Sequence, residues 1–193
     1  MAPILGIYAS QISGHLFTPS GAYDSIATVT VGAGGAASID LTSIPATYTH
    51  LQIRGIAKGA QTTYASDNFL FKVNNDSGSN YANHILKGDG SSATALANSS
   101  STPGIVSHNG LVGGSASNVF TTFVMDILDY ANTSKYKTIR TLTGFDANGS
   151  GVVELTSTLW QSTSAVNRLT FTEETGGNMA QYSTIAIYGI KGA

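Results

Sequence analysis

The sequence predicts an all-β protein, an antiparallel β-sandwich of jelly-roll-like type with about nine or ten strands. Short runs alternate between apolar and polar residues, clusters of Gly, Asn, Asp and Ser separate the runs, and no segment has the composition of a long helix. The runs recur every ~10–18 residues, which favours antiparallel pairs because parallel pairs need crossover helices. An immunoglobulin-like sandwich is the alternative, but the chain lacks the Cys–Trp–Cys core of that fold.

The composition suits one domain with a neutral surface. The chain has 193 residues, of which 41% are hydrophobic and only 10% are charged, against about 25% in ordinary globular domains. The polar surface must therefore come from uncharged groups, chiefly 23 Ser and 23 Thr residues. Threonine is β-branched and favours strands, whereas serine favours turns. Such surfaces are common where a protein packs against copies of itself or displays a neutral face outside a cell.

Charge and cysteine content argue against several function classes. Nine basic and eleven acidic residues give a net charge of −2, whereas nucleic-acid-binding proteins need a stripe of Lys and Arg to displace counterions from phosphate. The same balance disfavours a polybasic membrane anchor, and no apolar run approaches the ~20 residues of a spanning helix. The chain has no cysteine, so disulfides and Cys-based metal sites are impossible. We expect no nucleic-acid partner, no membrane partner and no cofactor.

We assign residues 1–20 to an N-terminal arm or packed segment and residues 21–193 to a single β-sandwich domain. No Lys or Arg occurs before Arg54, which disfavours a secretory signal. The first residues are too apolar for a free tail, so they either pack on their own domain or dock on a partner. Both alternatives use the same apolar side chains, which are Ile4, Leu5, Ile7, Tyr8, Ile12 and Leu16.

Individual strands follow from the phase of their apolar residues. Leu51 and Ile53 share one face, as do Phe69 and Phe71, and an Asn-Asn-Asp-Ser-Gly turn ends the second of these runs. The predicted strands are residues 25–31, 37–44, 49–56, 69–73, 81–86, 119–130, 135–145, 152–160, 166–172 and 181–190.

Two segments differ from this pattern. Residues 119–130 are apolar on both faces, with Phe123 on one and Val124 and Leu128 on the other, which suits a strand sandwiched centrally. A short buried helix would have the same pattern. Residues 89–118 are dominated by Ser, Ala, Asn and Gly, so we expect a long surface loop of the kind that often carries contacts.

The motifs of common enzymes are missing, and we expect no enzyme activity. Residues 113–117 come nearest to the G-x-S-x-G elbow of hydrolases but lack its final Gly, and no Gly-Lys pair precedes Ser or Thr as a phosphate-binding loop requires. The histidines are too widely spaced for the i, i+4 pair of a zinc peptidase, and we assign them to ordinary strand or loop positions. They are His15, His50, His84 and His108.

Paired carboxylates are a further source of catalysis to consider. Asp126 and Asp129 interrupt an apolar run and lie on opposite faces if the run is a strand, so they suit a turn or an ion pair. A glycosidase needs two carboxyl groups that converge on one cleft, which neither this pair nor Glu173 and Glu174 predicts. The cations available to the aspartates are Lys135, Lys137 and Arg140.

One turn resembles part of a calcium loop. Asp146, Asn148 and Ser150 have the spacing of the first half of such a loop. An EF-hand loop would require Glu at the position that Ser157 occupies, so a plain turn is the favoured alternative. This turn is the only metal-binding candidate that we retain.

The single tryptophan offers a candidate glycan site. Trp160 precedes a polar loop that begins at Gln161, and an aromatic ring beside neutral hydrogen-bonding groups is what a sugar platform requires. A core or interface tryptophan is the commoner alternative.

Several blocks along the chain are distinctive in their order of residues and not only in composition: ILGIYASQISGHL, SIATVTVGAGGAASI, SIPATYTHLQIRGIA, NNDSGSNYANHILKGDGSSA, DILDYANTSKYKTIRTLTG and YSTIAIYGIKG. These blocks are spread through the chain. Over most of its 193 residues the sequence resembles a family of small structural virion proteins of tailed bacteriophages, often aquatic, of the tail, fibre or appendage type. The resemblance implies a virion location, after assembly in the host cytoplasm, with exposure on the particle. It implies no catalytic residues.

The resemblance implies a non-enzymatic structural protein that self-associates, in a tail or collar fibre or as a decoration of the capsid surface. Closed cyclic symmetry is the usual form of such assembly, and we expect a homotrimer. The arm, residues 1–20, would bind other virion proteins. The alternative is a receptor-binding module of a tail fibre or spike, which would bind host-surface glycan through residues 89–118 or around Trp160. A polysaccharide depolymerase has the least support.

Overall fold

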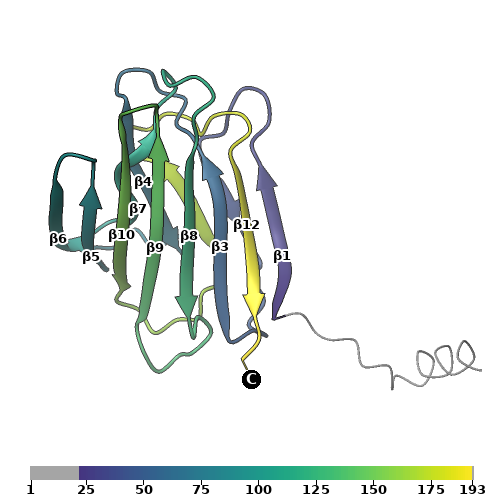
Figure 1. Cartoon of the computed structure of the whole chain (residues 1–193). Helices are drawn as coiled ribbons and strands as arrows, with labels where there is room; N and C mark the ends of the chain where they lie inside the picture. Colours follow the sequence, from purple (N-terminus) through teal and green to yellow (C-terminus); the bar gives the residue numbers. More distant parts are fainter. Residues whose placement is uncertain (1–21, 193) are drawn as a thin grey trace, which may run out of the picture.

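Twelve strands in two antiparallel sheets make up the computed structural model of the protein, which describes residues 22–192 (Figure 1). The predicted all-β sandwich is confirmed, and the expected nine or ten strands are two or three too few. The arm predicted at residues 1–20 lies outside the described residues.

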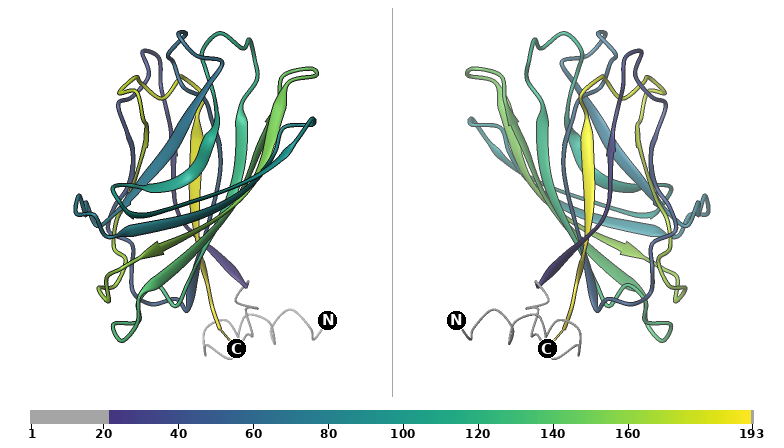
Figure 2. Two further views of the ribbon diagram at one scale, coloured as in Figure 1. Left: turned by 90° about the vertical axis from the view of Figure 1, so that its left-hand side faces the viewer. Right: turned by 90° about the vertical axis from the view of Figure 1, so that its right-hand side faces the viewer.

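The two sheets are unequal in width. The larger has eight strands in the order β1-β12-β3-β8-β9-β10-β5-β6, and the smaller has four in the order β2-β11-β4-β7. Seen from the side, the sheets form two layers (Figure 2). The strands are β1 (Tyr23–Thr30), β2 (Ile39–Leu41), β3 (His50–Ala57), β4 (Ser66–Val73), β5 (Tyr81–Gly88), β6 (Ala93–Ser101), β7 (Gly104–Val112), β8 (Thr121–Leu128), β9 (Lys137–Asp146), β10 (Gly151–Trp160), β11 (Leu169–Glu173) and β12 (Thr184–Ile190).

The core lies between the inner faces of the two sheets. Side chains alternate along each strand, so every second residue points inward. Phe69 and Phe171 of the small sheet meet Phe123 of the large sheet, with ring centroids 5.4–5.9 Å apart. Edge-to-face and tilted contacts of this kind add to the burial energy of the rings. Leu51 and Ile53, predicted to share a face, are fully buried on the inner side.

The expectation that residues 119–130 form a strand covered on both faces is wrong. Phe123 and its neighbours in phase are buried, but Val124 and Leu128 are 37% and 45% exposed. The segment β8 is central within its sheet, between β3 and β9, but the small sheet covers only its inner face. Apolar residues on the second face therefore mark an exposed surface.

The expectation of a long loop at residues 89–118 is also wrong. This segment holds two strands, β6 and β7. The strand β7 is largely buried and pairs with β4, whereas β6 is exposed and pairs with β5. Small residues such as Ala and Ser have little strand propensity of their own, so pairing with an adjacent strand decides their conformation here.

Close packing at one glycine gives a test of the sandwich. A Cβ atom at Gly55 in β3 would lie 2.6 Å from Cε1 of Phe123 and 2.9 Å from the carbonyl oxygen of Thr184. We expect Gly55→Ala to lower the free energy of unfolding by about 1–3 kcal/mol, because the inserted methyl group overpacks the core. Urea denaturation measures the change.

Gly88, in β5, provides the matched control. A Cβ atom there meets nothing within 4 Å. Gly88→Ala should leave stability unchanged or raise it slightly, because Ala restricts the unfolded chain. Equal free energies of unfolding for the two variants would contradict the packing described at Gly55.

Candidate functional site

The outer face of the eight-stranded sheet carries a row of exposed apolar side chains. The strand register places Leu86 opposite Leu155, Leu155 opposite Leu142, and Leu142 opposite Val124. These four residues, here called the leucine row, cross the neighbouring strands β5, β10, β9 and β8. They are 56%, 52%, 56% and 37% exposed in the order Leu86, Leu155, Leu142, Val124.

The surroundings of the leucine row extend its apolar character. Val153 lies two residues from Leu155 on the same face and is 62% exposed. A shallow groove of about 330 Å³ is lined by Leu86, Leu142, Val153 and Leu155, among others. Soluble monomers rarely expose large contiguous apolar patches, and such patches mark surfaces that contact other molecules.

The same outer face becomes polar towards β1. The row continues from Val124 to Arg54 of β3, which lies over the rings of Tyr23 and Tyr188 at 5.4 and 5.8 Å. The Nε of Arg54 donates to Gln52, and Nε2 of Gln52 donates to Asp126 at 2.8 Å. These polar side chains therefore have partners, and the apolar side chains of the leucine row are the part of the face that gains from being covered.

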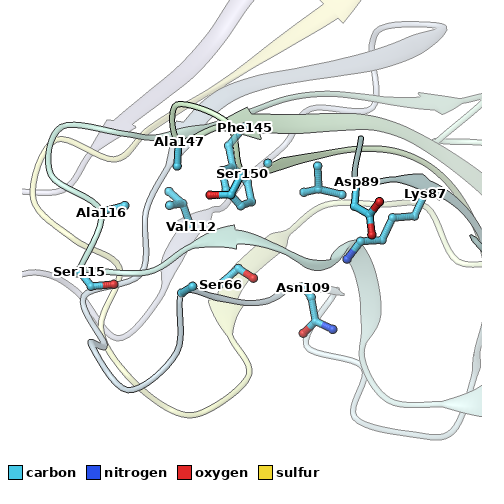
Figure 3. Close-up of a pocket in the computed structure, with 13 residues that line it drawn as sticks. Ser66, Lys87, Asp89, Asn109, Val112, Ser115, Ala116, Phe145, Ala147 and Ser150 are labelled. Carbon is cyan, nitrogen blue, oxygen red and sulfur yellow. The ribbon is translucent and has the colours of Figure 1, made fainter. Parts of the chain in front are cut away.

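A cavity of about 380 Å³ lies where the β9–β10 turn approaches the start of β4 and the loop after β7 (Figure 3). Its walls include Phe145, Val112 and Val152. An adjoining cavity of about 260 Å³ shares Phe145 as a lining residue. The phenyl ring thus borders both cavities, with polar side chains around it.

The charged residues of this cavity already have partners. Nζ of Lys87 donates to the carbonyl oxygen of His108 at 3.0 Å. The carboxylate of Asp89 accepts from the backbone N–H groups of Ser91 and Ser92 at 2.8 and 2.7 Å. The other polar side chains of the lining are uncharged: Ser66, Asn109, Ser115 and Ser150. A ligand in this cavity would meet hydroxyl and amide groups beside an aromatic ring.

The structure places Trp160 in the core. Its side chain is only 2% exposed, and its Nε1 donates to Oδ2 of Asp76 at 2.7 Å. Burial opposes the ionisation of Asp76, but hydrogen bonds from Trp160 and Asn80 outweigh it and lower the pKa of that carboxyl group. The sugar-platform hypothesis for Trp160 is therefore wrong, because the ring has no free face. Gln161, the next residue, is exposed.

The turn between β9 and β10 explains the calcium-like spacing. Oδ1 of Asp146 accepts from the backbone N–H groups of Asn148 and Gly149 at 2.7 and 3.3 Å. Asn148 and Gly149 have positive φ values of 60° and 102°, so the carboxylate closes a tight hairpin turn. Ser150 lines the cavity in Figure 3. Among residues 22–192, no group of three or more His, Asp or Glu side chains is arranged to hold a metal ion.

The paired carboxylates considered from the sequence do not converge. Asp129 forms an ion pair with Lys135, as its position predicts, while Asp126 accepts from Gln52 on the outer face. Glu173 is buried, whereas its neighbour Glu174 is exposed and accepts from Asn68 at 2.6 Å. Neither pair has the geometry of a glycosidase site.

Sequence reasoning missed a buried group of two carboxyls around one hydroxyl. Oγ1 of Thr175 lies 2.8 Å from Oδ2 of Asp67 and 3.1 Å from Oε1 of Glu173. The two acidic side chains are 5% and 3% exposed, and Oε2 of Glu173 has no hydrogen-bond partner. Burial, with the nearby charge of Asp67, raises the pKa of Glu173. A hydroxyl has only one proton to donate, so this arrangement favours a protonated Glu173.

Glu154 is a second buried carboxyl. It is 1% exposed, and it accepts from the hydroxyl of Ser107 and from the backbone N–H of His108. Burial raises the pKa of Glu154 despite these hydrogen bonds. Neither Glu154 nor Glu173 lines the cavity in Figure 3, so their contacts are with the fold itself.

Comparison with known proteins finds no matching protein-family model and no similar sequence among curated proteins. Within the part of the chain that the structure describes, no helix has the length and apolar character needed to span a membrane.

The raised pKa of Glu173 makes stability depend on pH. When pH rises above the ordinary pKa of glutamate, the unfolded chain ionises at this residue while the folded chain keeps its proton, so the wild type loses stability. We expect Glu173→Gln to match the wild type in acid and to become more stable than it as pH rises towards the raised pKa. Urea denaturation between about pH 3.5 and 8 measures the difference.

The neighbouring exposed residue provides the control for this experiment. Glu174→Gln removes the same charge from an exposed position, and the pH dependence of Glu173→Gln is measured relative to it. A Glu173→Gln difference that stays constant across the pH range would show that Glu173 titrates alike in both states.

Proposed function

We propose that the protein is a non-enzymatic structural component of a tailed-bacteriophage virion that self-associates, either in a tail or collar fibre or as a decoration of the capsid surface. The sequence resemblance supports the virion location. The leucine row is the observation that carries self-association, because it is an uncharged strip of four exposed apolar side chains that crosses four neighbouring strands. The low charge of the chain agrees with both.

The outer face is large enough for a stable interface. With strands ~4.8 Å apart and a rise of ~3.3 Å per residue, an eight-stranded sheet of eight-residue strands covers roughly 1,000 Å². A standard interface buries about 800 Å² on each partner. Covering the four half-exposed side chains of the leucine row would contribute about 1 kcal/mol each, since full burial of such a side chain is worth about 1.5–3 kcal/mol.

In this proposal the copies form a closed cyclic oligomer, with three as the expected number. Neighbouring copies cover most of each outer face, including its whole apolar half, and the β1 edge of the polar half stays accessible to water. The arm predicted at residues 1–20 attaches the oligomer to other virion proteins.

A charge placed in the leucine row tests the proposal. We expect Leu142→Lys to weaken association by at least about 2 kcal/mol, roughly a 30-fold change in dissociation constant, because a lysine ammonium group would be buried against apolar side chains. Sedimentation equilibrium measures the oligomer, and quantitative mass spectrometry of purified phage particles measures incorporation of the variant.

Thr28→Lys is the control for Leu142→Lys. Thr28 is exposed on the same outer face and the same cross-strand row, at the β1 end. This variant should assemble like the wild type. A monomeric wild-type protein, or equal effects of the two substitutions, would contradict the proposal.

The cavity around Phe145 supports a second candidate function, the binding of a host-surface glycan. It is lined by residues of the segment 89–118 together with the β9–β10 turn, and it presents neutral polar groups beside an aromatic ring. Its size, at the lower end of the range for ligand pockets, suits one or two sugar rings. The candidate site thus moves from Trp160 to Phe145.

This candidate predicts weak binding of neutral sugars. In saturation-transfer NMR with the methyl glycosides of glucose, galactose, mannose and N-acetylglucosamine, we expect at least one signal that Phe145→Ala reduces about tenfold, because the stacking surface is lost. Tyr136→Ala, at a 53% exposed ring outside this cavity, should leave the signal unchanged. Absence of signal from all four sugars would argue against glycan binding here.

A further inference from the structure

The two sheets have four edge strands, and three of them are protected against pairing with another chain. The edge strand β1 has an irregular register between Ser25 and Ala27, and Asp24 beside it forms an ion pair with Lys191 at 2.7 Å. The edge strand β2 has only three residues. The edge strand β7 is largely buried. Irregularity, charge, shortness and burial are the usual ways in which proteins protect sheet edges.

The fourth edge strand, β6, has none of these features between Ala93 and Asn98. All residues from Ala93 to Ser100 are exposed, and the segment 90–107 contains no charged residue. Its pairing with β5 is regular from Ala93 to Asn98, and one register shift follows near Ser101. An exposed regular edge without charge or proline is a ready template for another strand.

The strand β6 is also held in place for pairing. Asn83 of β5, which is fully buried, donates from Nδ2 to Oδ1 of Asn98 at 2.8 Å and to Oγ of Ser101 at 2.9 Å. These contacts fix the end of β6 beside its neighbour. A preformed strand loses little conformational freedom when a second strand is added.

We infer that β6 is an interaction surface for a second copy of this chain, with the two β6 strands paired antiparallel across a twofold axis. This inference rests on the proposed self-association and adds a second, twofold contact to it, which would join two of the proposed cyclic trimers into a dihedral assembly of six copies. The second copy is the occupant that charge favours. A twofold axis brings identical groups together, which costs nothing for a neutral strand but would place like charges opposite each other in a charged one.

Strand parity restricts the register of this pair. Ala95 lies opposite exposed Leu86 and so points to the outer face, whereas Leu96 lies opposite buried Ile85 and points to the inner side. A twofold axis normal to the sheet places the outer faces of both copies on the same side of the combined sheet. Residues that point outward must therefore lie opposite residues that point outward, and inward residues opposite inward ones. If the twofold axis passes at Leu96, the two Leu96 residues lie opposite each other. Ala95 then lies opposite Ala97 of the second copy.

Continuity of the outer face supports this arrangement. Ala95 is the next residue of the leucine row beyond Leu86, so the row reaches the free edge of the sheet. Pairing through β6 would extend the row from one copy into the next. It would also cover part of Leu96, which is 38% exposed.

Cysteine cross-linking tests the register directly, because the chain has no cysteine of its own. Directly opposed residues of an antiparallel pair have Cα atoms about 4.5–5.5 Å apart, within the span of a disulfide. We expect Leu96→Cys to form a disulfide-linked pair of chains in nearly full yield under oxidised glutathione. Non-reducing electrophoresis of the full-length protein measures the yield.

Ala95→Cys is the matched control. Two such residues would be offset by two positions along the strands, roughly 8 Å apart, beyond the ~7 Å limit for a disulfide. Ala95→Cys alone should cross-link at least tenfold less, and an equal mixture of the Ala95→Cys and Ala97→Cys proteins should cross-link well. Thr28→Cys, on the opposite edge strand, should give only the background level.

Each outcome decides the inference. Efficient cross-linking of Leu96→Cys with weak cross-linking of Ala95→Cys supports it, whereas equal yields, or no cross-link at either position, would overturn it. The result is separable from the proposed function. If Leu142→Lys dissociates the oligomer while Leu96→Cys stays uncross-linked, the edge contact is wrong and association through the leucine row stands.

Discussion

An eight-stranded sheet covered by a four-stranded one sets the main constraint on this protein. The core can form on only one face of the large sheet, where the aromatic cluster of Phe69, Phe123 and Phe171 joins the layers. The opposite face must be compatible with water or be covered by another molecule. The part of this face around β3 is compatible with water, because the polar groups around Arg54 are paired. The part from β5 to β8 carries the leucine row.

The sequence was sufficient to predict the sandwich because apolar residues occupy every second position of its strands and so mark the inward face. The phase of Leu51 and Ile53, and that of Phe69 and Phe71, predicts the buried faces that the structure has. The phase of Leu169 and Phe171 also points inward, and Glu173 continues it, so a buried carboxyl could have been predicted there. The alternation of apolar residues along a strand does not reveal how many strands the opposing sheet has. Without that number, the two apolar faces of β8 imply burial on both sides.

Tertiary context decided the features that the sequence could not provide. The strand β6 is built from small and hydroxyl residues, and its partner β5, not its own propensity, makes it a strand. The buried Trp160 donates its indole N–H to Asp76, a partner that is distant in sequence and that no local pattern identifies. The cavity at Phe145 combines segments around residues 66, 89, 112 and 150, which no local pattern connects.

The scarcity of charged residues also affects the entropy of assembly. Long Lys, Arg and Glu side chains lose about 1.5–2 kcal/mol of rotamer freedom each when they are immobilised, whereas the branched side chains of Val and Leu lose less. The leucine row consists of Leu and Val side chains, so fewer rotatable bonds are frozen when it is covered than on a surface of long charged side chains. Covering such a surface therefore costs less conformational entropy than covering one that is rich in Lys, Arg and Glu.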